Sequence, residues 1–423
     1  MSIRILLSLC ACLTLASCSN VNKPSQMTSD KPNVWVYSDL SDPRDRRSGG
    51  HPQTDPDDIV SLASFLLNAD RFNIVSVVVG STNRINLQNP MPFVEQTFVN
   101  AYRSDIKRLQ QQFPNAQSEI NFQWSSLTQK TNPHQFNPKR DYSDLSEFNT
   151  VKQLINFAKN NPVAVLSWGP ITEPAIAIKH LLDTGDHKTL SNITVISHWT
   201  KSQLSQGSVE QPFKVANCWD DYPACDYMHQ IALKEPNVKF IEVGSAGQKG
   251  LVNGSVNFEQ MEQFENSRLG QLFLRGKFYY GKPDQSDAAT HWLLTNLYPV
   301  NTQTYPNDGS LSIDQERDNV KRFYDAAPAM MQDLAQRNNA AAGSPFTKEH
   351  LSEFFTYVYK KKGKYEVYAP YADMNYQVFD NSGAEVKNGK FSFGNQELQI
   401  PVKAEKSYQV VVSYGDWQKQ YWL

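Results

Sequence analysis

The apolar positions of this chain occur in two alternating patterns. Short continuous runs, rich in β-branched residues, are typical of strands buried on both faces of a sheet. Between them, apolar residues recur every three or four positions, which predicts helices. The runs occupy residues 34–37, 72–79, 163–166, 193–197 and 238–243, and helical spacing occurs within residues 59–66, 91–113 and 150–159. This alternation predicts an α/β domain with a mostly parallel, Rossmann-type sheet and helices on both faces.

The last part of the chain follows a different pattern. Over residues 364–423, apolar and polar residues alternate between turn sequences that contain Asn and Gly, which predicts antiparallel strands joined by hairpins. We therefore expect a small C-terminal all-β sandwich. Residues 344–363 are predicted as a bridging helix, and residues 33–343 as the α/β domain.

The first residues have the pattern of a bacterial lipoprotein signal. Arg4 precedes an apolar run over residues 5–15, and small residues stand directly before Cys18. This order is typical of a cleaved signal peptide, and the run is too short to span a bilayer as a stable helix. We expect a signal over residues 1–18 with lipidation at Cys18, and a flexible tether over residues 19–32. We then expect the mature protein to be anchored to the bacterial cell envelope. The resemblance to such signals indicates the outer membrane. An ordinary cleaved signal peptide is the alternative.

Net charge and cysteine content bear on the partner and on the redox compartment of the protein. The formal net charge of −2 gives no electrostatic case for a nucleic-acid partner. Outside the signal region, the remaining cysteines are Cys218 and Cys225, which can pair in an oxidising compartment. A continuous helix would hold them about 10 Å apart, too far for a disulfide. Pro223 favours the loop that a disulfide requires.

Acidic residues gather where the first strand meets the first helix. Asp39 follows the strand, and Asp55, Asp57 and Asp58 precede the helix. Ligands of open α/β sheets bind beyond the carboxyl ends of the strands. Capping explains one acidic residue at a helix start, but a group of this size repels itself unless a cation lies among its members. Hard oxygen ligands suit Ca²⁺ or Mg²⁺. We therefore expect a cation site, with a solvated acidic loop as the alternative.

This stretch resembles the N-terminal signature of the nucleoside hydrolase superfamily, which is a strand, an Asp-rich turn that ends in Asp-Asp, and a helix. The likeness is greater to the secreted nucleoside hydrolase-like branch that carries a C-terminal β domain. Residues 44–53 look like an insertion within the otherwise compact turn. The resemblance implies Ca²⁺ ligation by Asp39 and Asp58, with Asp55 as the alternative to Asp39, and a sugar contact from Asp57.

Three later turns resemble turns of the same superfamily, in the same order. The first, after the strand at 163–166, implies that the Thr172 carbonyl is a cation ligand. The second implies sugar contacts from Asn217 and Asp221, although the family's Glu before the Asn is absent here. The third implies that Asp287 is the late cation ligand, with an N-cap as the alternative explanation.

Other candidate residues follow from the same comparison. Ser286 stands where the family often has a His that protonates the leaving base. His291, one turn later on the same helix face, is the substitute candidate for proton donor, or else a packed or surface histidine. Asn83 is a sugar contact or a plain turn residue. His198 and Trp199 follow a strand and are candidates for lining the pocket.

Together these features imply Ca²⁺-dependent hydrolysis of N-glycosidic bonds in ribonucleosides or related ribosides. Bound metal would lower the pKa of water, Asp39 or Asp58 would accept its proton, and His291 would act as the acid. The alternative is a carbohydrate-binding lipoprotein on the same scaffold, either non-catalytic or hydrolysing glycosides. The departures from the family before Asn217 and Asp287 favour that alternative.

Overall fold

The structure is a computed structural model. It describes residues 31–40, 57–81, 89–127, 136–255, 261–279, 282–344, 357–361, 363–368, 374–391, 397–403, 406–414 and 417–423. The predicted signal, the predicted lipidation site Cys18, and most of the predicted tether lie outside the described residues. So do the apparent insertion at 44–53, Asp55 and Asn83. None of the described helices combines the length and the apolar character that a membrane span needs.

A six-stranded parallel sheet forms the centre of the larger domain, with strand order β3-β2-β1-β4-β5-β6. Its strands are β1 (Asn33–Ser38), β2 (Asn73–Val79), β3 (Phe122–Trp124), β4 (Val163–Ser167), β5 (Ile193–Ser197) and β6 (Lys239–Glu242). Each strand of this sheet is parallel to its neighbours because helical segments connect them in sequence. The arrangement confirms the predicted α/β fold class.

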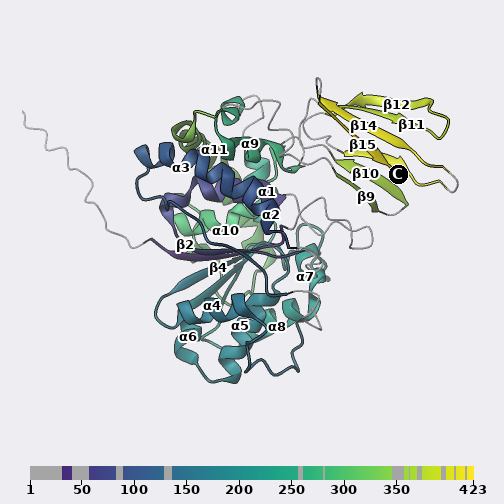
Figure 1. The fold of residues 1–423 in the computed structure, drawn as a ribbon. Helices are drawn as coiled ribbons and strands as arrows, with labels where there is room; N and C mark the ends of the chain where they lie inside the picture. Colours follow the sequence, from purple (N-terminus) through teal and green to yellow (C-terminus); the bar gives the residue numbers. More distant parts are fainter. Residues whose placement is uncertain are drawn as a thin grey trace, which may run out of the picture. The chain divides into compact units, whose positions relative to one another are not determined.

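Helices cover both faces of this sheet (Figure 1). Along β1, Val34 and Val36 enter one hydrophobic core, whereas Trp35 and Tyr37 enter the other, as the two-residue period of a strand requires. The first core is shared with α1 (Asp57–Leu67), α3 (Asn100–Gln112), α9 (Arg268–Arg275), α10 (Ala288–Trp292) and α11 (Ile313–Ala341). The second is shared with α4 (Asn149–Ala158), α5 (Thr172–Asp183), α6 (His187–Ser191) and α8 (Tyr222–Lys234).

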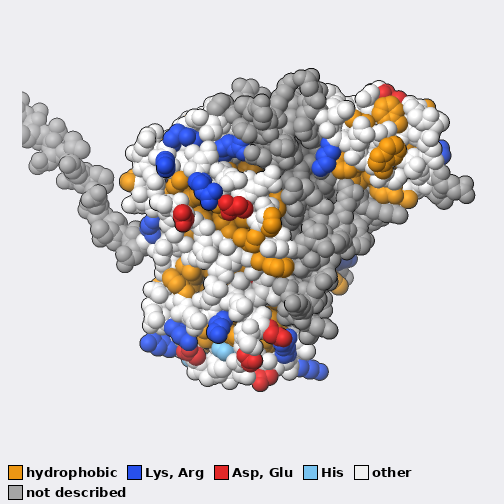
Figure 2. Space-filling model, viewed as in Figure 1, with side chains coloured by type: hydrophobic (Ala, Val, Ile, Leu, Met, Phe, Trp, Pro, Cys, Tyr) orange, Lys and Arg blue, Asp and Glu red, His pale blue; other side chains and the backbone are white. Residues whose placement is uncertain are grey.

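Shorter elements complete the domain. They are η1 (Ala69–Arg71), α2 (Met91–Val94), η2 (Glu95–Val99), α7 (Ala216–Asp220), η3 (Ala246–Val252), η5 (Glu262–Asn266), β7 (Phe278–Tyr279), β8 (Lys282–Pro283), η6 (Leu293–Thr295) and η7 (Thr302–Thr304). On the face drawn in Figure 2, acidic and basic side chains are interspersed, in keeping with a net charge near zero.

The strand order places a topological switch point between β1 and β4, which is where open α/β sheets bind ligands. The turn after β4 passes very close to the end of β1. A Cβ atom on Gly169 would lie 2.4 Å from Asp39 Oδ2, so this approach requires glycine. The carboxyl ends of the two strands therefore meet at a tightly packed edge.

The C-terminal part forms two antiparallel sheets. One has the order β13-β10-β9 and the other β12-β11-β14-β15. Their strands are β9 (Tyr357–Lys361), β10 (Lys364–Tyr368), β11 (Asn375–Phe379), β12 (Glu385–Lys390), β13 (Glu397–Pro401), β14 (Gln409–Tyr414) and β15 (Trp417–Trp422). Val367 and Leu398 from one sheet share a single core with Val378 and Val410 from the other. This confirms the predicted small all-β sandwich.

The bridging helix predicted over residues 344–363 is wrong for residues 357–361. These residues form β9, which pairs antiparallel with β10. Val358 is buried there, within an alternating segment of β-favouring residues. The preceding residues 345–356 lie outside the described part of the chain.

Candidate functional site

Three buried carboxylates, from Asp57, Asp58 and Asp287, form a compact group. One oxygen from each residue can be chosen so that all three lie within 4.8 Å of one another. Asp57 and Asp58 begin α1, and Asp287 directly precedes α10. Like charges at this separation repel strongly in a buried setting, so the arrangement favours a cation among them.

Hydroxyl groups hold each of these carboxylates in place. The Ser38 hydroxyl, at the end of β1, donates to Asp58 Oδ1. The Ser61 hydroxyl donates to Asp287 Oδ2 at 3.4 Å, and the Ser286 hydroxyl donates to Asp57 Oδ2 at 3.4 Å. Because hydroxyls are neutral, these bonds orient the carboxylates without balancing their charge.

Asp287 does not act as a helix cap through its side chain. It occupies the N-cap position of α10, yet its carboxylate makes no capping hydrogen bond to that helix. The carboxylate instead accepts from Ser61 and lies near His198. The capping explanation for this residue therefore does not fit its geometry.

One lysine lies beside the group. Lys277 Nζ is 3.1 Å from Asp57 Oδ2 and 3.8 Å from Asp284 Oδ2, and its side chain is 32% exposed. The Lys277 ammonium offsets part of the negative charge of these carboxylates, and a divalent cation beside Asp57, Asp58 and Asp287 would offset more of it.

A histidine also approaches the group. His198, which follows β5, places Nε2 3.8 Å from Asp287 Oδ1. A Cβ atom on Gly247 would lie 2.3 Å from the Ser286 carbonyl oxygen and 2.7 Å from His198 Cε1. Glycine at 247 therefore allows the histidine and the Asp287 turn to come together. Trp199, the next residue, has φ of 57°, is buried, and donates from Nε1 to the Ser205 carbonyl at 3.3 Å.

Asp39 lies outside the group of three. It is buried at the end of β1 against Gly169, and Asp57 occupies the third position in the compact group instead. The family resemblance implied a sugar contact for Asp57, whereas the first turn of α1 brings both consecutive carboxylates toward Asp287.

Asn217, Asp221 and Thr172 make structural hydrogen bonds. The Asn217 amide donates to the Trp168 and His198 carbonyls, both at 2.9 Å. Asp221 accepts from Thr172 Oγ1 at 2.5 Å and from the Phe136 backbone amide at 2.9 Å. These contacts give Asn217 and Asp221 a positioning role in the fold, and the sugar contacts expected of them stay predictions. The side chain of Thr172, the first residue of α5, is engaged by Asp221.

His291 lies in the hydrophobic core. Its ring lies 5.4 Å from Phe65, 6.0 Å from Phe72 and 5.5 Å from Trp292, measured between centroids. Neither ring nitrogen has a hydrogen-bond partner in the described part of the chain. Burial, helped by the Arg71 charge, lowers the pKa of His291 to about 3. This buried position and lowered pKa fit the packed histidine that the sequence suggested as the alternative to a proton donor.

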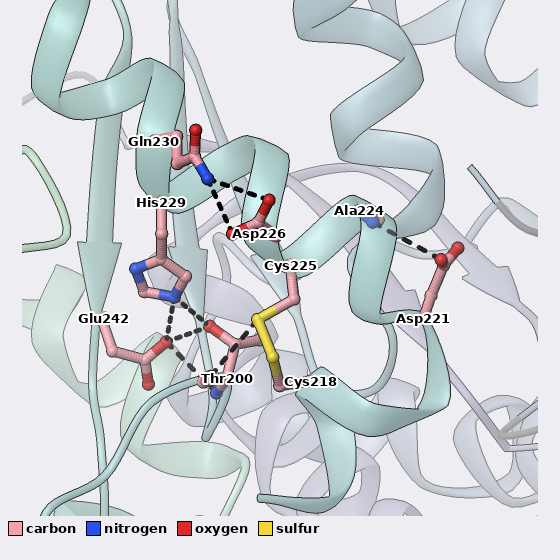
Figure 3. Close-up of a disulfide and its surroundings, with 9 residues drawn as sticks. All are labelled: Thr200, Cys218, Asp221, Ala224, Cys225, Asp226, His229, Gln230 and Glu242. Atoms are coloured by element: carbon pink, nitrogen blue, oxygen red, sulfur yellow. Dashed lines mark hydrogen bonds and ion pairs between the residues drawn. A yellow bond between two sulfur atoms is a disulfide. The ribbon is translucent and has the colours of Figure 1, made fainter. Parts of the chain in front are cut away.

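Cys218 and Cys225 form a disulfide with Cα atoms 5.2 Å apart (Figure 3). The helical path is interrupted at Asp221, between α7 and α8, where φ is −145° and ψ is 76°. Pro223 lies in the first turn of α8, so the break that a disulfide needs occurs just before the proline.

Sequence reasoning missed Lys277 and the contact between His198 and Asp287. His198 was named only as a possible lining residue, from its place after a strand. Lys277 carries no motif, since it lies in a turn that reaches Asp57 only through the tertiary fold.

Comparisons with known proteins agree with part of this picture. Residues 51–233 match the family model described as "Cellulose-binding Sde182, nucleoside hydrolase-like domain". The matched span includes Asp57 and Asp58 and ends before Asp287. None of the curated proteins compared with the chain matches it. The match supports the nucleoside hydrolase-like resemblance found in the acidic turn.

A solved structure from Saccharophagus degradans is also similar. It is described as a nucleoside hydrolase-related hypothetical protein that is associated with carbohydrate metabolism. The two chains share 12% identity at a TM-score of 0.45, and the alignment covers 93% of this chain and 98% of that one.

Proposed function

We propose that this protein recognises a carbohydrate through a calcium ion held by Asp57, Asp58 and Asp287. The observation that carries the proposal is the set of three buried carboxylate oxygens within 4.8 Å of one another. Calcium takes about six to eight oxygen ligands. Three protein oxygens therefore leave positions for water and for the hydroxyl groups of a sugar.

The ligand class has two lines of support. The family model that matches residues 51–233 is described as cellulose-binding. The donor set consists of carboxylate oxygens, which suits Ca²⁺, and sugar hydroxyls are further oxygen ligands that could fill the remaining positions. Lys277 would neutralise part of the group before the cation arrives, and His198 would lie beside the bound sugar.

A second candidate function is hydrolysis of N-glycosidic bonds in ribosides, and the position of His198 favours it. When bound, the cation would lower the pKa of a water molecule. Asp57 or Asp58 would accept the proton of that water as its oxygen bonds to the anomeric carbon. His198 would donate a proton to the departing base nitrogen as the C–N bond breaks, so that the base leaves neutral.

Two binding assays and one product assay test these functions. We expect soluble oligosaccharides or ribosides to bind in Ca²⁺ and to dissociate in EDTA, and we expect Asp58→Asn to remove this calcium-dependent binding. Binding that is equal in Ca²⁺ and EDTA would contradict the proposal. Release of free base from a nucleoside panel, lost in His198→Gln, would select hydrolysis. Binding without release of base would support carbohydrate recognition without hydrolysis.

A further inference from the structure

Two large aromatic side chains stand exposed where α7 meets α8, with Trp219 in α7 and Tyr222 at the start of α8. Trp219 is 61% exposed and Tyr222 is 45% exposed. Their ring centroids are 5.8 Å apart and the ring planes are inclined by 36°. Exposed apolar surface of this kind marks binding sites more often than isolated apolar residues do. The pair offers two adjoining flat faces to a ligand.

A groove of about 700 Å³ lies beside this pair. Tyr222 and Tyr227 line it together with the polar side chains of Asn137, Asp226 and Gln230. Gln230 Nε2 donates to both Asp226 oxygens, at 2.8 and 2.9 Å, which fixes the amide and the carboxylate side by side (Figure 3). Aromatic walls with a few oriented polar groups are typical of sites that bind small molecules.

The turn that carries the aromatic pair is rigid. The Cys218–Cys225 disulfide closes the segment 218–225, which contains both rings. Asp221 fixes its centre by accepting hydrogen bonds from the Phe136 and Ala224 backbone amides. Both cysteines are fully buried, so the segment is held from inside while the rings face outward. Such preorganisation reduces the entropy that binding would otherwise cost.

We propose that the Trp219–Tyr222 pair and the adjoining groove bind a β-linked glucan chain. Pyranose rings in such chains present flat faces of C–H groups and edges of equatorial hydroxyls. The aromatic rings contact the faces, and the Asp226–Gln230 pair contacts the edge hydroxyls. This inference rests on the proposed function only for the sugar class of the ligand, because the aromatic surface needs no cation.

The position of α7 connects this surface to the edge of the sheet. Asn217, two residues before Trp219, donates to the Trp168 and His198 carbonyls at the carboxyl ends of β4 and β5. The same short helix therefore presents Trp219 outward and contacts the switch-point edge inward. A glucan chain held on the aromatic pair is kept near that edge.

Titration calorimetry with cellohexaose, in EDTA, tests this site on the full mature chain. We expect wild-type protein to bind under these conditions. The double variant Trp219→Ala/Tyr222→Ala should bind about tenfold or more weakly, since it loses aromatic stacking contacts. Trp219→Phe should retain a measurable part of the affinity. Tyr324→Ala removes a ring that is 52% exposed on α11 and should bind like wild type.

Three results would overturn the inference. The first is unchanged binding by the double variant. The second is loss of binding in Trp422→Ala instead, since Trp422 is 73% exposed in the C-terminal sandwich. The third is glucan binding that requires Ca²⁺. This result would support the proposed function and contradict the aromatic glucan site. Conversely, glucan binding in EDTA without any calcium-dependent ligand would support the aromatic site and contradict the proposed function.

Discussion

The charge on three neighbouring side chains is the main physical question at the residue scale. Asp57, Asp58 and Asp287 are buried together, and the hydroxyls that orient them carry no charge. Lys277 offsets one charge at 3.1 Å from Asp57. An unoccupied group should therefore destabilise the fold, and a bound cation should reverse that effect.

Asp287→Asn should change stability in opposite directions with and without calcium. In EDTA the variant loses one repulsive charge, and we expect it to be more stable by about 1 kcal/mol. In millimolar Ca²⁺ it loses a ligand, so it should be less stable than wild type. Thermal unfolding in both buffers measures the crossover. Asp105→Asn, a buried carboxylate near Arg108 outside the group, should show no calcium-dependent difference. Parallel shifts of Asp287→Asn in both buffers would argue against a cation.

His291→Leu should flatten the loss of stability in acid. An unfolded histidine titrates near pH 6.5, but burial lowers the pKa of folded His291 to about 3. Between these values the unfolded chain binds the extra proton, so stability falls as the pH falls, by up to about 1.4 kcal/mol per pH unit. Denaturant unfolding between pH 6.5 and 5 should give a smaller slope for the variant. His229, whose pKa burial also lowers to about 3, keeps part of the slope. An unchanged slope would mean that His291 is not held neutral.

At the scale of elements, periodicity predicted most of the α/β core but not all of its contacts. The strands at 34–37 and 193–197 were found because buried parallel strands are continuously apolar. The three-residue β3 is too short for such a signal, and β9 was mistaken for helix because its identity depends on pairing with β10. Asp58 and Asp287 were identified from turns in family order. Lys277 and the role of Asp57 depend on how α1 packs against later segments, which spacing alone does not determine.

The link between α7 and α8 allows a test at this scale. Cys218→Ser/Cys225→Ser removes a disulfide that closes a short loop, and we expect a loss of about 2–3 kcal/mol in unfolding free energy. Denaturant unfolding of the variant, beside wild type with and without a reductant, measures the loss. Reduced wild type should match the variant. Equal stability of all three would show that the turn is fixed by its other contacts, such as those of Asp221.

At the scale of the whole molecule, the chain combines an α/β domain with a small all-β sandwich, each with its own core. The N-terminal signal pattern adds a proposed lipid anchor at Cys18, which would hold both domains at the cell envelope. The net charge of −2 offers no electrostatic attraction to nucleic acid.

Cys18→Ser should abolish labelling of the protein by a fatty-acid analogue, because the variant lacks the thiol that would carry the acyl chain. Labelling in growing cells measures this, and Cys10→Ser within the signal is the matched control, which should be labelled like wild type. Continued labelling of the Cys18→Ser protein would contradict the anchor.

Calorimetric titration of the metal-free protein with CaCl₂ tests the cation site most directly. We expect one calcium ion per chain, with affinity reduced on the order of 100-fold in each of Asp57→Asn, Asp58→Asn and Asp287→Asn. Asp105→Asn should bind calcium like wild type. Absence of binding, or binding that all three variants keep, would contradict the claim that these carboxylates hold a cation.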